Sequence, residues 1–518
     1  MTQSPLSVPA LLRRSVAEFG ESVYLVTPTE RLTYREADQR SADLARWLLH
    51  QGVGKGSRVG LFFPNGAEWV TWWLAVSRIG AVAVPLSTLY TPAEIAKVLR
   101  LADIGLLIAP STVLNIDVAE RLEAALPELA DHATSRPAMR AAPYLRGIAL
   151  IGATDRPWAT CHVPTDQVPA EVLAAAEAEV SPADLAIMVH TSGSTADPKG
   201  VLHTHGTLVR QTSTWPAAIR AITGTPDQSR ILCAMPFFWI GGLLAVTGAL
   251  HEPVTLVVMP KLDPETALDL AEREQITGIV GWPAFTQQLR EHPSFPDRDL
   301  SSAPMLREGP LDIAMTDVPD GFPVHRTMSE TAGGFVFTDL AIVDEQGAPV
   351  AAGETGELLV RGIGVMAGYN KRERFETFDA DGWYHTGDKV YRRDGDPRLF
   401  YVGRTTDLIK AAGANVSPLE VEAVISESAA VAQCVVVGID DPQRGEEVCA
   451  VVVPAAELDL AALAAYSREQ LSAYKVPTRW ALTTSDRIPT LASGKFDRKR
   501  LRQLIIDGPL KTVRLTPQ

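Results

Sequence analysis

The sequence predicts an α/β protein made of a large N-terminal domain, whose parallel-rich sheets are packed by helices, and a small α+β C-terminal domain. The chain has 518 residues, which is too many for one ordinary hydrophobic core. Over roughly the first 400 residues, short apolar runs alternate with amphipathic segments, a pattern that favours buried, mostly parallel sheets. Near Gly353 the pattern changes, and short helical and strand segments follow Arg404. We therefore place the two domains at residues 1–403 and 408–518.

Apolar runs of strand length define the predicted sheets of the N-terminal domain. They occupy residues 58–63, 81–85, 105–108, 147–151, 185–190, 231–234, 255–259 and 277–281. Amphipathic periodicity between and after the first two runs predicts helices over residues 67–79 and 92–102. The segment 126–182 is rich in Ala, Pro and charge, and we expect surface connections and helix there.

Turn signals organise the rest of the chain. Residues 356–362 are predicted as a strand and a turn, and Asp394-Gly395-Asp396 separates two strand runs that should form a hairpin. The C-terminal domain is predicted as helix 418–426, strands 432–438 and 447–453, helix 458–471, strand 479–483 and helix 496–505. Ser417 is the expected N-cap of the first of these helices, and Glu420 is placed to close a capping box.

The composition argues against several classes of protein. A net charge of -14 and an isoelectric point near 5.3 disfavour a nucleic-acid-binding surface and contact with an anionic membrane. The four cysteines are scattered without a C-x-x-C pair, which is typical of reduced structural thiols. Residues 1–20 lack an apolar core of signal-peptide length, and the apolar stretch 69–84 is short and interrupted. We expect a cytoplasmic protein without a membrane span, and the oligomeric state stays open.

Residues 191–200 form the most informative segment of the chain. They combine four hydroxyl side chains, two glycines and Lys199 within ten residues. Glycines let the backbone approach a ligand, amides and hydroxyls donate to phosphate oxygens, and lysine adds positive charge. The spacing differs from that of a Walker P-loop. Taken alone, the segment is equally compatible with a polyphosphate-binding loop and with a polar surface loop.

Two acidic motifs lie further along the chain. Met328-Ser329-Glu330-Thr331 places a carboxylate beside two hydroxyls, a donor set suited to Mg²⁺ that arrives with ATP phosphates. A helix N-terminus is the alternative interpretation of this motif. Asp388 ends a Thr-Gly-Asp sequence, and its carboxylate could accept two hydrogen bonds from vicinal ribose hydroxyls. A plain turn is the alternative there.

Two basic residues and a stretch of small residues complete the set of motifs. Arg404 could contact ribose or phosphate, and residues 411–414 around Gly413 have almost no side-chain bulk, which would let a thin ligand arm pass. Lys495 follows Ser-Gly and could enter a cleft from the C-terminal domain. The alternatives are an interdomain linker with surface charges and a solvated lysine.

In this order and spacing, the motifs resemble those of the adenylate-forming superfamily, which contains acyl-CoA synthetases, peptide-synthetase adenylation domains and luciferases. The resemblance covers residues 34–501 and is closest to acyl- and aryl-CoA ligases. It includes Asn65-Gly66-Ala67-Glu68-Trp69, Gly368-Tyr369 and Tyr474-Lys475-Val476-Pro477. The resemblance implies that the C-terminal domain is mobile and rotates about a hinge at residues 404–407, with Thr406 as the hinge residue.

The resemblance also implies a two-step reaction. A carboxylate attacks the α-phosphate of Mg·ATP to give an acyl-adenylate and pyrophosphate, and a thiol, usually that of CoA, then displaces AMP. The ATP and AMP contacts would come from Thr191, Ser192, Gly193, Ser194, Thr195, Lys199, Arg326, Ser329, Asp388 and Arg404. Glu330 would bind Mg²⁺, Lys495 would bridge the attacking carboxylate and the α-phosphate, and Gly413 would line the CoA tunnel. Fixed donors and cations are the expected catalytic devices, because charge develops on phosphate oxygens.

Several positions depart from the family pattern. Ala196 stands where glycine is usual, Trp239 where many members have a gating histidine, and Arg326 where a tyrosine usually stacks on adenine. We expect Trp239 to be a wall or gate of the acyl pocket. The pocket would draw on Trp239, Ile240, Gly241, Trp282, Met328, Thr331 and Gly333. Large aromatic residues beside small ones suit an apolar or aromatic acid.

The sequence therefore predicts an ATP-dependent carboxylate–CoA ligase. The departures at Trp239 and Arg326 motivate an alternative in which the acceptor is a carrier protein, an amine, or nitrite in a diazotisation. A non-catalytic nucleotide-binding module is a third hypothesis, and the presence of Glu330, Asp388 and Lys495 argues against it.

Overall fold

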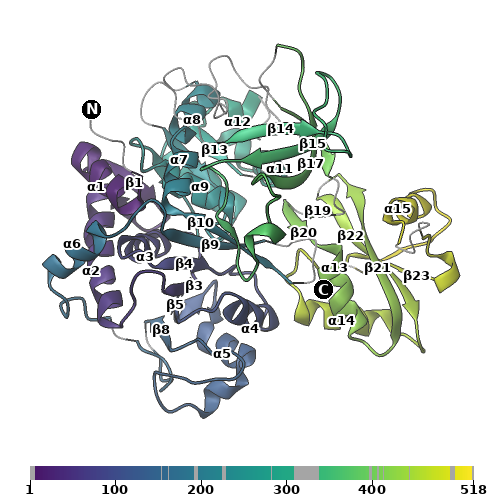
Figure 1. Cartoon of the computed structure of the whole chain (residues 1–518), viewed down its shortest axis with the longest axis horizontal. Helices are drawn as coiled ribbons and strands as arrows, with labels where there is room; N and C mark the ends of the chain where they lie inside the picture. The colour runs from purple at the N-terminus through teal and green to yellow at the C-terminus, as the bar shows by residue number, and fades with distance from the viewer. Residues whose placement is uncertain are drawn as a thin grey trace.

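The computed structural model describes residues 6–152, 154–161, 163–191, 197–224, 229–281, 283–308, 338–395, 399–404, 408–411, 413–442, 444–490 and 496–515. Figure 1 shows a large body, coloured from purple to green, beside a smaller yellow-green body formed by the C-terminal part of the chain. The predicted fold class is confirmed, because mixed α/β sheets build the large part and a compact α+β unit builds the small one.

A seven-stranded sheet forms the centre of the N-terminal part, in the order β16-β10-β9-β4-β3-β5-β8. Its strands are β3 (Arg58–Leu61), β4 (Val82–Pro85), β5 (Leu106–Pro110), β8 (Gly147–Ile151), β9 (Leu185–Thr191), β10 (Lys199–Thr204) and β16 (Gly368–Tyr369). The five strands β8, β5, β3, β4 and β9 are parallel to one another in this order, whereas β10 pairs antiparallel with both β9 and β16. β10 is not among the predicted strands, because its residues are mostly polar.

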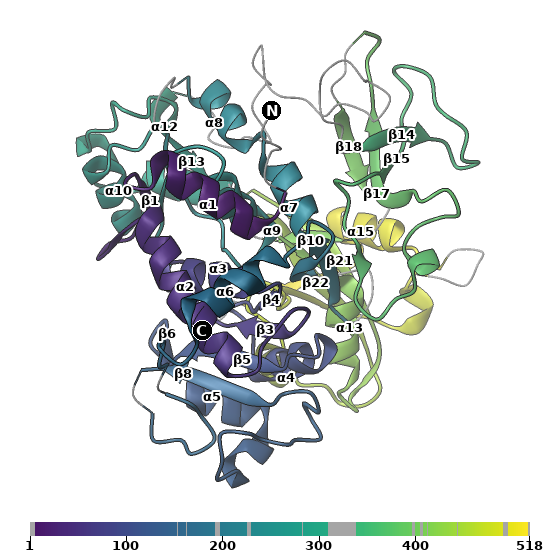
Figure 2. The same cartoon turned by 60° about the vertical axis from the view of Figure 1, so that its left-hand side comes forward.

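Helices cover both faces of this sheet. α2 (Tyr34–His50) and α3 (Ala67–Arg78) pack on one face, and α4 (Pro92–Leu101) and α5 (Val118–Ala125) pack on the other. Figure 2 shows α2 and α3 on one side of β3 and β5, and α4 and α5 on the opposite side. The apolar stretch 69–84 is thus a buried helix followed by a strand. Among the described residues, we find no helix that is both long and apolar enough to cross a membrane.

A second sheet has five strands in the order β13-β11-β12-β1-β2. They are β1 (Val23–Val26), β2 (Arg31–Thr33), β11 (Arg230–Cys233), β12 (Thr255–Val257) and β13 (Gly278–Val280), and only the β1–β2 pair among them is antiparallel. The helices α1 (Val8–Phe19), α3 and α9 (Ile240–Gly248) share one hydrophobic core with the two sheets. In this core the ring of Trp69 lies 6.0 Å from Trp73 and 5.2 Å from Phe237.

A four-stranded antiparallel sheet follows, in the order β14-β15-β17-β18. Its strands are β14 (Asp339–Val343), β15 (Gly356–Arg361), β17 (Tyr384–Tyr391) and β18 (Phe400–Arg404). β17 and β18 form the hairpin that the Asp-Gly-Asp turn signal predicts.

The C-terminal sheet has the order β20-β19-β22-β23-β24, with β21 also paired to β22. Its elements are β19 (Ile409–Ala411), β20 (Ala414–Val416), α13 (Pro418–Ser426), β21 (Val431–Asp441), β22 (Gly445–Pro454), α14 (Leu460–Gln470), β23 (Arg479–Leu482), α15 (Arg498–Ile506) and β24 (Val513–Arg514). Alternate residues of β21 and β22 face α13 and α14 on one side and α15 on the other. The predicted helix over 496–505 begins two residues later, because Phe496 pairs with Thr490 in an antiparallel bridge.

The remaining elements are short connections and further helices. They are β6 (Thr112–Val113), β7 (Ile116–Asp117), η1 (Pro127–Asp131), α6 (Ala170–Ala178), α7 (His205–Thr212), α8 (Trp215–Thr223), α10 (Pro264–Arg273), α11 (Pro283–Glu291), η2 (Phe295–Asp297), α12 (Met305–Glu308), η3 (Arg374–Glu376) and η4 (Ser485–Arg487). Of these helices, α7 is largely buried, and α10 and α11 contribute to a third hydrophobic cluster.

Candidate active site

The predicted phosphate loop connects two antiparallel strands. β9 ends at Thr191 and β10 begins at Lys199, and these two residues are partners in the strand register. Ser192, Gly193, Ser194 and Thr195 lie outside the described residues. The two strands therefore hold the ends of the loop side by side, as a loop that closes around a ligand requires.

Lys199, at the C-terminal end of this loop, lies against an aromatic ring. Its Nζ lies 5.1 Å from the ring centroid of Tyr369, whose hydroxyl is 2.7 Å from that of Tyr384. Burial and the neighbouring Arg372 lower the pKa of the Lys199 ammonium below its ordinary value. Tyr369 belongs to the Gly-Tyr motif of the family resemblance, and the structure shows that it supports the predicted phosphate-binding lysine.

Asp388 and Arg404 are brought together by the β17–β18 hairpin. The two residues are partners in the strand register, although they belong to two separate sequence motifs. The plain turn considered for Asp388 is wrong, because Thr386, Gly387 and Asp388 lie within strand β17.

The backbone around Asp388 forms a bulge. The register between β15 and β17 shifts at this point, and Gly387 has a φ of 71°, a conformation that favours glycine. The amide of Asp388 donates to Thr386 Oγ1 at 3.0 Å, and the amide of Gly387 donates to Glu357 Oε1 at 3.0 Å. A bulge of this kind re-aims one side chain out of the regular alternation of the strand.

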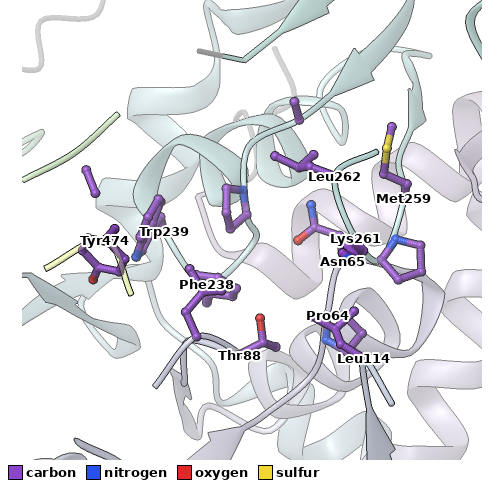
Figure 3. Close-up of a pocket in the computed structure, with 15 residues that line it drawn as sticks. Pro64, Asn65, Thr88, Leu114, Phe238, Trp239, Met259, Lys261, Leu262 and Tyr474 are labelled. Atoms are coloured by element: carbon purple, nitrogen blue, oxygen red, sulfur yellow. The ribbon is translucent and has the colours of Figure 1, made fainter. Parts of the chain in front are cut away.

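A cavity of about 300 Å³ lies between the N-terminal and C-terminal parts of the molecule. Most of its lining residues are apolar, and two of them, Ala414 and Tyr474, come from the C-terminal domain. The complete lining consists of Pro64, Asn65, Thr88, Leu89, Leu114, Ala234, Pro236, Phe238, Trp239, Met259, Pro260, Lys261, Leu262, Ala414 and Tyr474. Figure 3 shows Trp239 and Tyr474 together at one end of the cavity, and Met259 and Pro64 toward the other.

Trp239 is the predicted pocket residue that lines this cavity. It precedes α9, and its ring lies 5.5 Å from Phe238 and 6.0 Å from Tyr474, the latter in an edge-to-face arrangement. Ile240 begins α9 and its side chain is 53% exposed. A Cβ on Gly241 would lie 2.5 Å from Met235 Cε, so glycine allows α9 to pack closely there.

Asn65 fixes the backbone of the cavity wall. Its Nδ2 donates to the Met235 carbonyl at 2.9 Å, and its Oδ1 accepts from the Phe237 amide at 2.8 Å. Asn65, Ala414 and Tyr474 are missing from the predicted site residues. Asn65 and Tyr474 were visible in the sequence as members of family-like motifs, but only the tertiary structure shows that they line one cavity.

Gly413 lies in the tight turn between β19 and β20. Ala411 and Ala414 are antiparallel partners and are buried, and Gly413 has a φ of 82°. Glycine at position 413 is therefore favoured by the positive φ as well as by the lack of side-chain bulk that the sequence suggested. Ala414, which follows this turn, lines the same cavity as Trp239.

Several predicted site residues lie outside the described part of the chain. They are Trp282, Arg326, Met328, Ser329, Glu330, Thr331, Gly333, Thr406 and Lys495. The backbone of Arg404 is described within β18. Within the described ranges, no group of three or more His, Cys, Asp or Glu side chains is arranged to hold a metal ion. Mg²⁺ at Glu330 therefore stays a prediction from the sequence.

Comparison with known proteins gives consistent matches along the chain. A family model described as AMP-binding enzyme matches residues 12–316, and one described as AMP-binding enzyme C-terminal domain matches residues 420–495. Feruloyl-CoA synthase from an Amycolatopsis species is 32% identical and is covered over 94% of its length by 91% of this chain. A methyl-dioxo-octahydroindenyl-propanoyl:CoA ligase from Mycobacterium tuberculosis is also 32% identical, over 96% of this chain and 99% of that protein.

Among solved structures, the amide bond synthetase McbA from Marinactinospora thermotolerans has a similar fold. The TM-score is 0.75 at 25% sequence identity, with 96% of this chain and 99% of that chain covered.

Proposed function

Because the chain belongs to the AMP-binding enzyme family and is an ATP-dependent, CoA ligase-like adenylate-forming enzyme, we propose that it joins an apolar or aromatic carboxylic acid to CoA. In the first step, a carboxylate oxygen attacks the α-phosphorus of ATP, the bond to the β-phosphate breaks, and pyrophosphate leaves. In the second step, the CoA sulfur attacks the acyl carbon, the bond to AMP breaks, and the thiol proton passes to solvent.

The roles of the ATP-binding residues follow from their chemistry. The loop between Thr191 and Lys199 would bind the β- and γ-phosphates, and Glu330 would hold Mg²⁺, which would supply positive charge beside the phosphates. The Asp388 carboxylate accepts hydrogen bonds from the ribose hydroxyls. The antiparallel pairing of Thr191 with Lys199 and the bulge that re-aims Asp388 support these two assignments.

The interdomain cavity is the observation that carries the choice of CoA as acceptor. A pantetheine arm is long and thin and ends in a thiol, and it needs a narrow passage whose walls are mostly apolar. The cavity has mostly apolar walls, a volume of about 300 Å³ and, on one side, Ala414, which follows the turn at Gly413. We assign this cavity to the pantetheine arm, with Trp239 as the wall between the thiol and the acyl group.

Lys495 and the hinge complete the proposal. Lys495 stabilises negative charge at the α-phosphate during the first step. Residues 404–407, with Thr406 at the centre, let the C-terminal domain exchange the segment that contains Lys495 for the Gly413 turn. Figure 1 shows α15 on the outer side of the C-terminal domain, which supports assigning this orientation to the second step.

An amine acceptor is the second candidate. The observation that favours it is the similarity to an amide bond synthetase at 25% identity over 96% of this chain. An amine would attack the same acyl carbon and release AMP in the same way.

The proposal predicts which products the purified protein makes. With ATP, Mg²⁺ and a panel of aromatic and apolar acids, we expect pyrophosphate release without CoA, and an acyl-CoA product by mass spectrometry when CoA is added. Parallel reactions contain an amine, nitrite or a phosphopantetheinylated carrier protein in place of CoA. Adenylate formation with an amide product and no thioester would replace CoA by the second candidate. Failure to release pyrophosphate with any acid would overturn adenylation itself.

A further inference from the structure

A buried lysine joins the two domains. Lys475 is 3% exposed, and its Nζ donates to Glu420 Oε1 at 2.8 Å and to Glu94 Oε1 at 2.7 Å. Glu420 lies on α13 in the C-terminal domain, whereas Glu94 lies on α4 in the N-terminal domain. Both carboxylates are also nearly inaccessible, with side-chain exposures of 7% and 8%. Taking charged groups out of water is costly, so a buried arrangement of this kind needs close geometry on every partner.

Neighbouring polar contacts strengthen the same junction. Ser472 Oγ donates to Glu94 Oε2 at 2.7 Å, and Thr91 Oγ1 donates to the Gln470 carbonyl at 3.1 Å. The first turn of α4 therefore binds the segment that connects α14 to β23. Lys97 lies further along α4 and forms an ion pair with Asp197, near the C-terminal end of the predicted phosphate loop. The distance from Lys97 Nζ to Asp197 Oδ1 is 2.6 Å. One helix thus touches both the C-terminal domain and the phosphate loop.

Each charged group keeps a partner inside its own domain. Glu94 closes the capping box of α4, because its Oε2 accepts from the Thr91 amide at 2.8 Å while Thr91 Oγ1 accepts from the Glu94 amide. The bond from Lys475 to Glu420 lies entirely within the C-terminal domain, so it does not depend on contact with Glu94. Since breaking a buried pair is expensive chiefly when it strands one charge, the Glu94–Lys475 bond can open and close at a reduced cost.

The position of Lys475 links this bond to the cavity. Tyr474, the preceding residue, lines the cavity and contacts Trp239. When Lys475 is bound to Glu94, the same backbone segment is therefore held where Tyr474 and Ala414 form the cavity wall.

We propose that Glu94 and Lys475 are positioning residues for thioester formation: their interdomain ion pair holds the C-terminal domain in the orientation that completes the CoA cavity. The inference rests on the proposed function, since it assigns the cavity to the pantetheine arm. Adenylation needs a different orientation of the C-terminal domain and does not use the pair. The two half-reactions should therefore respond differently when the pair is weakened.

The test compares two matched substitutions. Glu94→Gln weakens the ion pair, and Glu36→Gln makes the same change in the Thr33–Glu36 capping box of α2, whose glutamate is exposed and has no contact with the C-terminal domain in the described structure. We expect Glu94→Gln to slow thioester formation from preformed acyl-adenylate about tenfold, within the 5–150-fold range typical of coupling between sites. Its adenylation rate, measured as pyrophosphate release without CoA, should stay within about twofold of wild type, a change far below that range.

Two further measurements keep the proposal testable if the acceptor is not CoA. A dye on the exposed native Cys161 and one on an introduced Lys499→Cys report the distance between the domains by energy transfer. Glu94→Gln should reduce the docked population in this assay, and Glu36→Gln should not. The double variant Glu94→Gln/Lys475→Gln should lose no more docking than Lys475→Gln alone, because Glu94→Gln then has no interdomain ion pair left to remove.

Equal losses in both half-reactions, or identical behaviour of Glu94→Gln and Glu36→Gln in docking, would overturn the proposal. If wild type forms the adenylate but no thioester, the choice of CoA fails, and the docking assay still decides the role of the pair.

Discussion

Asp388 shows how the orientation of one side chain depends on the backbone that holds it. Its sequence neighbours, Thr386 and Gly387, are typical turn residues, and they instead form a bulge inside β17. The hydroxyl of Thr386 donates to the Leu358 carbonyl at 2.7 Å and accepts from the Asp388 amide, which fixes the bulge from both sides. Thr386 and Gly387 therefore indicate an irregular backbone at this point, and pairing with the neighbouring strand β15 makes it a bulge instead of a turn.

Asp388→Asn should weaken ATP binding. The substitution removes the negative charge that strengthens hydrogen bonds to the ribose hydroxyls, and bonds to charged groups contribute about 1.5–3 kcal/mol. We expect the KM for ATP to rise about ten- to a hundredfold, measured by pyrophosphate release at saturating acid. Asp394→Asn is the matched control, because Asp394 is exposed in the turn of the same hairpin. An unchanged KM for ATP in Asp388→Asn would remove Asp388 from the ribose site.

At the scale of elements, one short turn brings a small residue, Ala414, to the interdomain cavity. β19 and β20 are joined through Gly413, and Ala414, the partner of Ala411 in this pair, lines the same cavity as Trp239. At the start of α13, Ser417 Oγ accepts from the Glu420 amide, which confirms the predicted N-cap. The predicted closing of a capping box by Glu420 is wrong, because its carboxylate is instead an ion-pair partner of Lys475. The backbone amide of Glu420 thus takes part in the N-cap of α13, while its side chain contacts a residue that is distant in sequence.

A comparison of Gly413→Ala with Gly395→Ala should distinguish an effect on stability from an effect on thioester formation. Gly413 and Gly395 both lie in strand-connecting turns and both have positive φ, 82° and 71°. Alanine at either position should cost about 1 kcal/mol in the free energy of unfolding, because a Cβ is strained in this conformation. Only Gly413→Ala should also slow thioester formation, measured as acyl-CoA produced from preformed adenylate. If Gly395→Ala slows that step equally, backbone strain alone explains the effect.

At the scale of the whole molecule, the interior contains several neutral histidines. Burial lowers the pKa of His190, His203, His205 and His251 to about 4, below the ordinary value of 6.5. His205 Nδ1, for example, accepts a hydrogen bond from the Val8 amide at 3.3 Å, which ties α1 to the start of α7. These side chains serve the packing of the N-terminal domain in their uncharged form.

The stability of the protein should therefore fall as the pH drops from about 6.5 toward about 4. In this window the unfolded chain binds protons on these histidines and the folded chain does not, so acid favours unfolding. Each histidine contributes up to about 1.4 kcal/mol per pH unit to the slope. Urea unfolding at a series of pH values measures it. His251→Gln should reduce the slope, whereas the exposed His50→Gln should leave it unchanged. A stability that is constant from pH 6.5 to 5 would contradict the histidine assignment.

The sequence by itself determined the types of most elements, and it predicts the chemistry of the site. Apolar runs predict β3, β4, β5 and β8 because buried parallel strands need such runs. The ordered polar motifs carry donors that suit phosphate and a carboxylate that can accept from ribose hydroxyls, and their resemblance to a known family implies adenylation. Tertiary structure decided which of these groups meet. Lys475 and Glu94 are separated by 381 residues, and neither has a local pattern that points to the other. Their contact, like the cavity wall shared by Trp239 and Tyr474, depends on how two separately packed domains are oriented. Local spacing does not encode that orientation.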